Sequence, residues 1–301
     1  MKINLLEMIR FTTATLERIS PRMALWWVSR LFFSPRTSQR EMPELPNLEQ
    51  RWLGFTAIDG SQSKCRIYSS GAGPVVLLIH GWEGSASSFT AIARRLLDEG
   101  HRVVLFDLPA HGYSPGKKTN LVEIGRVIKK LEDDEGKFHA IIGHSFGAAC
   151  AGHAIKSGVS MEHFVSISAP TTISFIIDRF CYMVGASEKT RQGLIQRIEA
   201  ILQGPHEQES LTELAANFKP AGLIIHDRKD RVVPYSHAEA FSSAWPGARL
   251  FDTHSLGHSR ILKDEEVIQV IASRILAWRE LGGRVKTCPV PRFPVQRSRA
   301  S

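Results

Sequence analysis

Cysteine is scarce in this chain of 301 residues, and the few cysteines form no recognisable pattern. Cys65, Cys150, Cys181 and Cys288 are widely separated and include no CxxC pair. This spacing argues against a zinc site and against a disulfide framework. We therefore expect no metal, a reducing environment and a cytoplasmic location.

The sequence also lacks a long apolar run. None of its apolar runs reaches the roughly 20 residues that a helix needs to span a bilayer. Residues 1–19 have neither the compact apolar segment nor the small-residue cleavage site of a signal peptide, and charged side chains interrupt them. We expect a soluble chain, with association at a membrane surface as the open alternative.

Acidic residues are absent from the end of the chain. Residues 284–301 contain five arginines and lysines and no aspartate or glutamate, so this tail holds five of the eight excess positive charges. Because the excess does not form a basic, aromatic-rich face, we expect no nucleic-acid partner. The tail contains three prolines and no apolar periodicity, which predicts a basic, disordered segment.

Residues 1–50 are predicted to form a helical extension and a linker. Apolar residues recur at helical spacing before Pro21, and residues 22–33 form a second short helical segment. The aromatic residues of that segment have two interpretations: peripheral contact with a membrane, or packing onto the main domain. We favour packing, because few cations flank the aromatic residues. These residues are Trp26, Trp27, Phe32 and Phe33.

Residues 51–283 are predicted to form the main domain, in which short runs rich in valine and isoleucine alternate with longer amphipathic segments. The predicted strands are 75–79, 102–106, 140–142, 164–167, 223–225 and 248–251. The predicted helices are 87–98, 121–133, 146–157, 236–244 and 264–280. This alternation predicts an α/β fold, a doubly wound and mostly parallel sheet with helices on both faces. Functional groups then lie on loops at the carboxyl ends of the strands.

Residues 171–218 interrupt the alternation with no strand pattern. Within residues 188–203, five apolar side chains lie on one helical face. We predict that this insertion is a small helical cap between two strands.

A serine follows one of the predicted strands in a pattern typical of a nucleophile. Ser145 lies between Gly143 and Gly147 in "GHSFG", after the strand at 140–142 and before a helix. This is the arrangement of a nucleophile elbow, in which small glycines let two backbones pass closely. A serine hydroxyl is a weak nucleophile, so it also needs a base and a residue that orients the base.

Candidates for both partners occur later in the chain, in the order acid and then histidine. Asp227 and Asp230 follow the strand at 223–225, and either one can be the acid. His258 follows the strand at 248–251, and His254 competes with it as the base. The base would take the serine proton and return it to the leaving group, while the acid holds the tautomer of the base.

The developing negative charge of such a reaction needs hydrogen-bond donors. The segment "LLIHGWEGS" places a glycine-containing turn after the strand at 75–79. We expect the backbone N–H groups of Trp82 and Phe146 to form the oxyanion hole. Because no phosphate-binding loop or metal-ligand cluster is evident in the sequence, we expect no cofactor.

These motifs together resemble the α/β-hydrolase superfamily, over about residues 51–280. The matching segments are "HGW" at His80, "DLPAHGYS" at Asp107, "GHSFG" at Gly143, "HDRKDRVVP" at His226 and "GHS" at Gly257. The resemblance implies a catalytic triad of Ser145, Asp230 and His258. A serine at the elbow separates the chain from the family branches that use aspartate there.

The resemblance implies a cofactor-free serine hydrolase that cleaves a carboxylic ester or thioester through an acyl-enzyme. It leaves open an acyltransferase with the same triad, or a ligand-binding member of the fold without catalysis. In capped hydrolases the segment after "SISAP" lies over the nucleophile, so its apolar side chains indicate a small-molecule substrate with an apolar acyl group. The candidate substrate-binding residues are Phe175, Phe180, Tyr182 and Met183.

Overall fold

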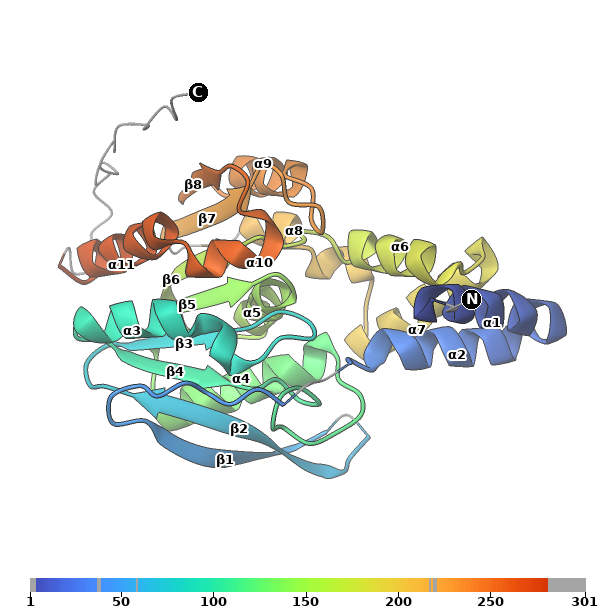
Figure 1. The fold of residues 1–301 in the computed structure, drawn as a ribbon, viewed down its shortest axis with the longest axis horizontal. Coiled ribbons are helices and arrows are strands. Elements are labelled where there is room, and N and C mark those ends of the chain that lie inside the picture. Colours follow the sequence, from blue (N-terminus) through green and yellow to red (C-terminus); the bar gives the residue numbers. More distant parts are fainter. Residues whose placement is uncertain (1–3, 37–38, 58, 217, 219–220, 281–301) are drawn as a thin grey trace.

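The computed structural model describes residues 4–36, 39–57, 59–216, 218 and 221–280. Within these residues, eight strands form one sheet in the order β1-β2-β4-β3-β5-β6-β7-β8 (Figure 1). β2 is antiparallel to both of its neighbours, and all other adjacent strands are parallel. The predicted α/β fold with a mostly parallel sheet is therefore confirmed.

The elements alternate along the chain much as the sequence predicts. The strands are β1 (Glu49–Thr56), β2 (Gln62–Ser70), β3 (Val75–Ile79), β4 (Arg102–Phe106), β5 (Phe138–His144), β6 (Met161–Ile167), β7 (Ala221–Asp227) and β8 (Ala248–Thr253). The α-helices are α1 (Leu5–Ile19), α2 (Pro21–Phe33), α3 (Thr90–Asp98), α4 (Leu121–Glu135), α5 (Phe146–Lys156), α6 (Ile173–Val184), α7 (Glu188–Leu202), α8 (Leu211–Ala215), α9 (Ser236–Ala244), α10 (Gly257–Arg260) and α11 (Glu265–Glu280). Short 3-10 helices occur at Ala86–Phe89, His206–Glu209 and Ile261–Lys263.

The two antiparallel strands are an addition that the sequence pattern does not predict. In β1 only Leu53 and Phe55 are buried, and β2 begins with polar residues, so neither strand has the apolar run of a central parallel strand. β1 also begins at Glu49, so the sheet starts two residues before the predicted boundary at residue 51.

Helices cover both faces of the sheet. α3 and α11 contribute buried apolar residues such as Leu96 and Ile271 to one core. α4, α5 and α9 contribute residues such as Ile128, Ala151 and Phe241 to the other. This two-faced burial explains the continuous apolar runs of the parallel strands.

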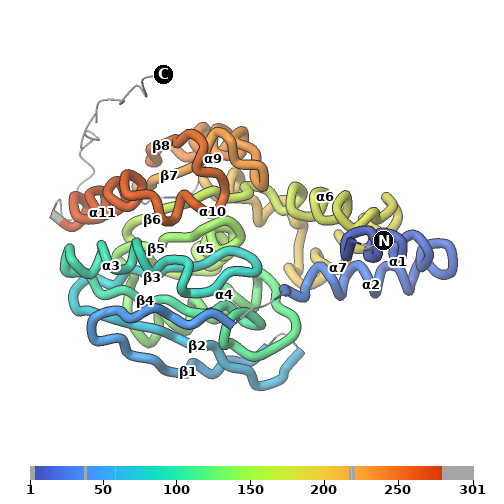
Figure 2. The backbone as a smooth tube through the Cα atoms, viewed as in Figure 1, coloured from blue at the N-terminus to red at the C-terminus, as the bar shows by residue number. Residues whose placement is uncertain are grey.

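α1 and α2 form a helical hairpin that packs against the predicted cap, not directly onto the sheet (Figures 1 and 2). α1 contacts α6, and α2 contacts α7. The Glu17 carboxylate accepts hydrogen bonds from the Ser187 N–H at 2.8 Å and the Thr190 hydroxyl at 2.6 Å, which joins the end of α1 to the start of α7. Packing of the aromatic segment is partial, because Trp27 is half-buried whereas Trp26 is exposed.

Residues 171–218 contain α6, α7, the 3-10 helix at 206–209 and α8, and no strand is present in their described part. The predicted tail, residues 284–301, lies outside the described residues. Among the helices of the described chain, none is both long enough and apolar enough to cross a membrane.

Candidate active site

Ser145 lies in a sharp turn between β5 and α5, near the middle of the sheet. Its φ of 52° and ψ of −123° are unusual for a residue with a side chain, and such strain costs about 1 to 3 kcal/mol. The turn also requires its glycines. A Cβ on Gly147 would lie 2.3 Å from the Ile79 carbonyl oxygen, and one on Gly143 would lie 2.5 Å from the Cα of Ala148. The "GHSFG" pattern thus holds Ser145 at the carboxyl edge of the sheet.

His258 lies on α10, which follows β8, and its side chain reaches Ser145. Its Nε2 lies 3.0 Å from Ser145 Oγ, and its Nδ1 lies 2.7 Å from Asp230 Oδ2. A carboxylate can only accept, so Nδ1 carries the proton and donates to Asp230. Nε2 is then free to accept the Ser145 hydroxyl proton, which is the arrangement of a general base.

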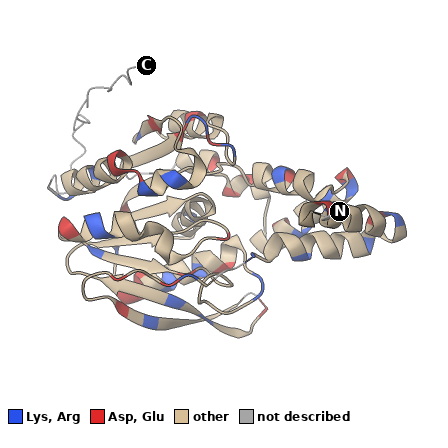
Figure 3. Cartoon of the chain, in the orientation of Figure 1, with Lys and Arg blue, Asp and Glu red and all other residues tan. Residues whose placement is uncertain are grey.

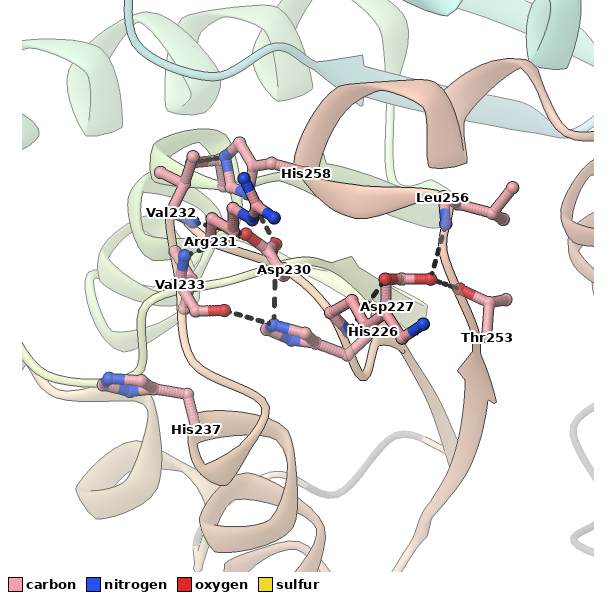
Figure 4. A network of polar contacts seen from close by, with 12 residues as sticks. His226, Asp227, Asp230, Arg231, Val232, Val233, His237, Thr253, Leu256 and His258 are labelled. Carbon is pink, nitrogen blue, oxygen red and sulfur yellow. Dashed lines mark hydrogen bonds and ion pairs between the residues drawn. The ribbon is translucent and has the colours of Figure 1, made fainter.

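The two candidate acids have different partners, as Figure 4 shows. Asp230 contacts His258, whereas Asp227 accepts hydrogen bonds from the Thr253 hydroxyl at 2.8 Å and the Leu256 N–H at 2.9 Å. Asp227 therefore orders the loop that connects β8 to α10, and α10 carries His258. His254, the alternative base, is exposed and lies 3.7 Å from Asp252, outside the Ser145 site.

The Asp230 side chain is fully buried yet charged, because the protein supplies donors to it. Its Oδ1 accepts from the N–H groups of Val232 and Val233 at 2.7 and 3.0 Å. Burial alone would raise the pKa of Asp230, but the His258 hydrogen bond and charge together with these N–H groups outweigh burial and lower the pKa.

Two further histidines support the site, and sequence reasoning assigned no specific contact to either. His144 Nε2 donates to the His258 carbonyl at 2.8 Å. His226 Nε2 donates to the Val233 carbonyl at 2.9 Å (Figure 4). Burial and the neighbouring His258 lower the pKa of His144 to about 4. A neutral His144 can hold the His258 backbone without adding a second positive charge beside the base.

The turn after β3 lies directly against Ser145. A Cβ on Gly81 would be 3.0 Å from Ser145 Cβ, and the rings of Trp82 and Phe146 meet edge to face at 5.3 Å. Within the described chain, neither Trp82 N–H nor Phe146 N–H donates to a backbone carbonyl. Both donors are thus available next to the serine, as an oxyanion hole requires.

An arginine from the linker holds this turn in place. Glu83 has a φ of 58°, and its carboxylate accepts from the Arg36 backbone N–H at 3.1 Å and from the guanidinium at 2.9 and 3.0 Å. Burial would raise the pKa of Glu83, but Arg36 outweighs burial and lowers it. No sequence signal connects residues 47 positions apart, so this support could not be anticipated.

Ser145 opens into a cavity of about 500 Å³ whose walls are mostly apolar. The cap contributes Ile176, Phe180 and Met183, but the hairpin also forms a wall, with residues that the sequence did not assign to the site. These hairpin residues are Leu5, Leu6, Ile9, Leu31, Phe32 and Phe33. A larger groove of about 1100 Å³ lies beside β1 and β2 and is not lined by Ser145, Asp230 or His258.

Three of the four candidate cap residues line this cavity. Phe175, Phe180 and Met183 do so, and Phe180 packs edge to face on Phe32 at 5.1 Å. The prediction for Tyr182 is corrected, because its side chain is 82% exposed and does not line the cavity. Neighbouring residues on a helix point about 100° apart, so Met183 can face inward while Tyr182 faces solvent.

The other chemically active side chains near the motifs have structural contacts. His80 Nε2 accepts from the Leu108 N–H at 3.0 Å. Asp107 accepts from the Ala86 and Tyr113 N–H groups at 2.8 and 2.9 Å, which orders the loop after β4. Cys150 is fully buried on α5, and burial raises its pKa well above the ordinary value, so its thiol is unreactive at neutral pH.

Two groups in the described chain have nitrogen and oxygen atoms close enough to hold a metal ion. One is His139, Glu162 and His163, and the other is Glu199, His206 and Glu207. Neither group includes a residue of the Ser145 site, so neither bears on its chemistry.

Comparison with known proteins agrees with the fold. A profile described as alpha/beta hydrolase fold matches residues 74–221. The dihydrolipoyllysine-residue acetyltransferase component of the acetoin cleaving system of Cupriavidus necator is 25% identical over 243 residues, 68% of this chain and 63% of that protein. Human protein phosphatase methylesterase 1 is 33% identical over 103 residues, 31% of this chain and 27% of that protein. The chain thus spans less than two thirds of these relatives.

Solved structures give the same fold over more of the chain. An esterase from Pyrococcus furiosus aligns with a TM-score of 0.60 at 21% identity, covering 82% of this chain and 97% of that one. The thioesterase domain from the curacin biosynthetic pathway aligns with a TM-score of 0.56 at 18% identity, covering 76% and 99%. Identities this low show the fold alone.

The chain has the α/β-hydrolase fold, as its motifs suggested.

Proposed function

We propose that this α/β hydrolase is a serine hydrolase that cleaves a carboxylic ester or thioester with an apolar acyl group. The observation that carries the proposal is the chain of contacts from Ser145 through His258 to Asp230, at 3.0 and 2.7 Å, at the wall of a mostly apolar cavity. No cofactor is part of the proposed chemistry.

The reaction follows from the donors and acceptors in place. His258 Nε2 takes the Ser145 proton as Oγ bonds to the substrate carbonyl carbon, and the N–H groups of Trp82 and Phe146 stabilise the resulting oxyanion. The oxyanion collapses and breaks the bond to the alcohol or thiol, which leaves with the proton from His258. Water then attacks the acyl-enzyme with His258 again as base, which releases the carboxylic acid and restores Ser145.

The cavity supports the apolar acyl group. An acyl chain in contact with Phe32, Ile176 and Phe180 would be removed from water. Each methylene buried in this way adds about 0.8 kcal/mol to the free energy of binding. Two of the solved structures that share the fold are an esterase and a thioesterase domain. Their names support ester or thioester cleavage as the class of reaction.

An acyltransferase with the same triad is a second candidate, supported by the match to the acetyltransferase component of Cupriavidus necator. In that case an alcohol or thiol replaces water in the second step. Product analysis with and without an added acceptor separates the two, because a transferase forms a new ester or thioester only when the acceptor is present.

Ser145→Ala tests the proposal directly. Loss of the nucleophile should lower kcat on a p-nitrophenyl ester by about a million-fold and abolish labelling by a fluorophosphonate. Ser243→Ala, at an exposed position on α9, is the control and should retain both. Substantial turnover or labelling of folded Ser145→Ala would assign the nucleophile to another residue. A series of acyl esters and acyl-CoA thioesters then defines the substrate class.

A further inference from the structure

The entrance of the Ser145 cavity is apolar and open to solvent. Leu5, Met183 and Val232 line the cavity, yet they are 54%, 44% and 42% exposed. They come from α1, from α6 and from the loop after β7, so three separate segments place an apolar side chain at the entrance. An exposed apolar rim around a site is typical of a surface that contacts another apolar body.

The apolar surface continues from this rim along α1 and α6. Met8 and Phe11 on α1 are 51% and 74% exposed, and Tyr182 on α6 is 82% exposed. Arg10 joins the two helices, because its guanidinium donates to the Met183 and Tyr182 carbonyls at 2.9 and 3.3 Å. We call this surface the mouth patch; it consists of Leu5, Met8, Phe11, Tyr182, Met183 and Val232.

The mouth patch concentrates the exposed apolar side chains of the protein. Six of the ten large apolar residues that are exposed in the described chain belong to it, and three more, Ile19, Met23 and Trp26, lie on the same hairpin. The hairpin and α6 project from the sheet domain (Figure 1). Projecting helices can reach a flat surface that the sheet domain does not touch.

The charges of the hairpin favour an anionic partner. α1 and α2 contain four arginines and two glutamates, and most of their ribbon carries no charge (Figure 3). One of the glutamates, Glu17, already accepts hydrogen bonds from Ser187 and Thr190. The cations near the aromatic residues are few, but the structure places one directly on an exposed ring: the Arg30 guanidinium lies 5.7 Å from the centre of the Trp26 ring. An arginine beside an exposed aromatic side chain is typical of helices that lie at a membrane surface.

We propose that the mouth patch docks on an anionic lipid bilayer, and that the acyl substrate of Ser145 enters the cavity from that bilayer. A bilayer needs no shape match to the projecting helices, and it holds the apolar chains that fit the cavity. Because the patch is continuous with the cavity wall, an acyl chain can pass from lipid to protein without crossing water. Docking does not depend on the proposed function, whereas substrate entry rests on it.

Vesicle flotation of the full chain tests docking. The chain should float with phosphatidylcholine vesicles that contain phosphatidylglycerol, and less with phosphatidylcholine alone. Phe11→Glu should lower the bound fraction about tenfold or more, since it removes an apolar side chain that docking would bury in the bilayer and adds a negative charge, which the anionic lipid repels. Trp52→Glu is the matched control, because Trp52 is an exposed aromatic residue on β1, outside the hairpin and α6. This variant should bind vesicles as the unaltered chain does.

Substrate entry is tested by comparing two esters of the same acid. The rate on a long-chain ester held in vesicles, divided by the rate on a soluble short-chain ester, should fall in Phe11→Glu and not in Trp52→Glu. Soluble turnover and fluorophosphonate labelling report the proposed function separately, so they persist if only the bilayer proposal fails.

Three results would overturn the bilayer proposal: absence of flotation with either vesicle, equal losses in both variants, or self-association of the chain that Phe11→Glu abolishes. The last result would assign the mouth patch to a second copy of the chain. Far-UV circular dichroism of both variants shows that any difference is not due to unfolding.

Discussion

The carboxyl edge of the sheet and the helical cover, formed by the hairpin and the cap, meet at one cavity. The two regions differ in how deeply their apolar side chains are buried. At the sheet edge, Ser145 and Asp230 follow strands whose apolar side chains are almost entirely buried, and backbone N–H groups fix the Asp230 carboxylate. The cover, which is the hairpin and the cap, exposes many of its apolar residues and supplies the cavity wall instead.

The comparison indicates a division of roles. The edge determines where the reacting atoms lie. Bond formation requires that these positions be correct to within about a fraction of an ångström. The cover determines the volume and polarity around the substrate, which changes more gradually with each side chain. Substitutions at the edge should therefore change kcat strongly, and substitutions in the cover should change which acyl group fits.

The largest contrast within the edge is expected between its two aspartates. Asp230→Asn should lower kcat by about 10⁴-fold, because an amide in place of the carboxylate favours the wrong tautomer of His258. Asp227→Asn should cost less, since Asp227 contacts Thr253 and Leu256 and not His258. Steady-state kinetics on a soluble ester, with circular dichroism on both variants, makes the comparison. The opposite ranking would move the acid to Asp227.

Activity should rise with pH across the range in which a histidine base loses its proton. Only neutral imidazole accepts the serine proton, so kcat/KM should fall as pH falls from about 8 to about 5. Asp230 stays a carboxylate in this range because its pKa is lowered. A flat profile from about pH 5 to about pH 8, where histidine titrates, would contradict a histidine base.

Stability must be measured in parallel, because acid also weakens the fold. The pKa of His144 is about 4 in the folded state, so the unfolded chain binds a proton first as pH falls from about 6.5. Between those values the free energy of unfolding should fall by about 1.4 kcal/mol per pH unit for this one group. The pKa of Asp230 is lower in the folded protein than in the unfolded chain, so the Asp230 carboxylate stabilises the fold at pH values above its unfolded pKa. This stabilisation is lost as pH falls through the folded pKa. Urea unfolding at each pH separates these losses of stability from the pH dependence of activity.

The smallest expected effect belongs to the cover. Phe180→Ala should enlarge the cavity and shift the preferred acyl group to a longer chain. Each extra methylene that becomes buried should raise kcat/KM about fourfold, which corresponds to about 0.8 kcal/mol. Tyr182→Ala, two residues away and outside the cavity, should keep the original preference for soluble esters. An unchanged chain-length profile in Phe180→Ala would show that the acyl group lies elsewhere.

Much of the fold and of the site geometry could be predicted because the signals are local. β3, β4 and α9 have the predicted bounds, and the residues that meet at the site follow β5, β7 and β8 as the pattern indicates. β1 and β2 could not be predicted in this way, since their stability comes from pairing at the edge of the sheet and not from an apolar run.

By itself, the sequence determined the elements that depend on near neighbours: the parallel strands, the glycine-flanked turn at Ser145 and the order of the acid and the histidine. The family resemblance already implied Asp230 as the partner of His258, and the structure places it there. Only the tertiary structure turned Met183 inward and Tyr182 outward, and brought the hairpin to the cavity. The physical reason is that periodicity and turn chemistry act over a few residues. Which helix face meets a cavity depends instead on packing between segments that lie far apart in the chain.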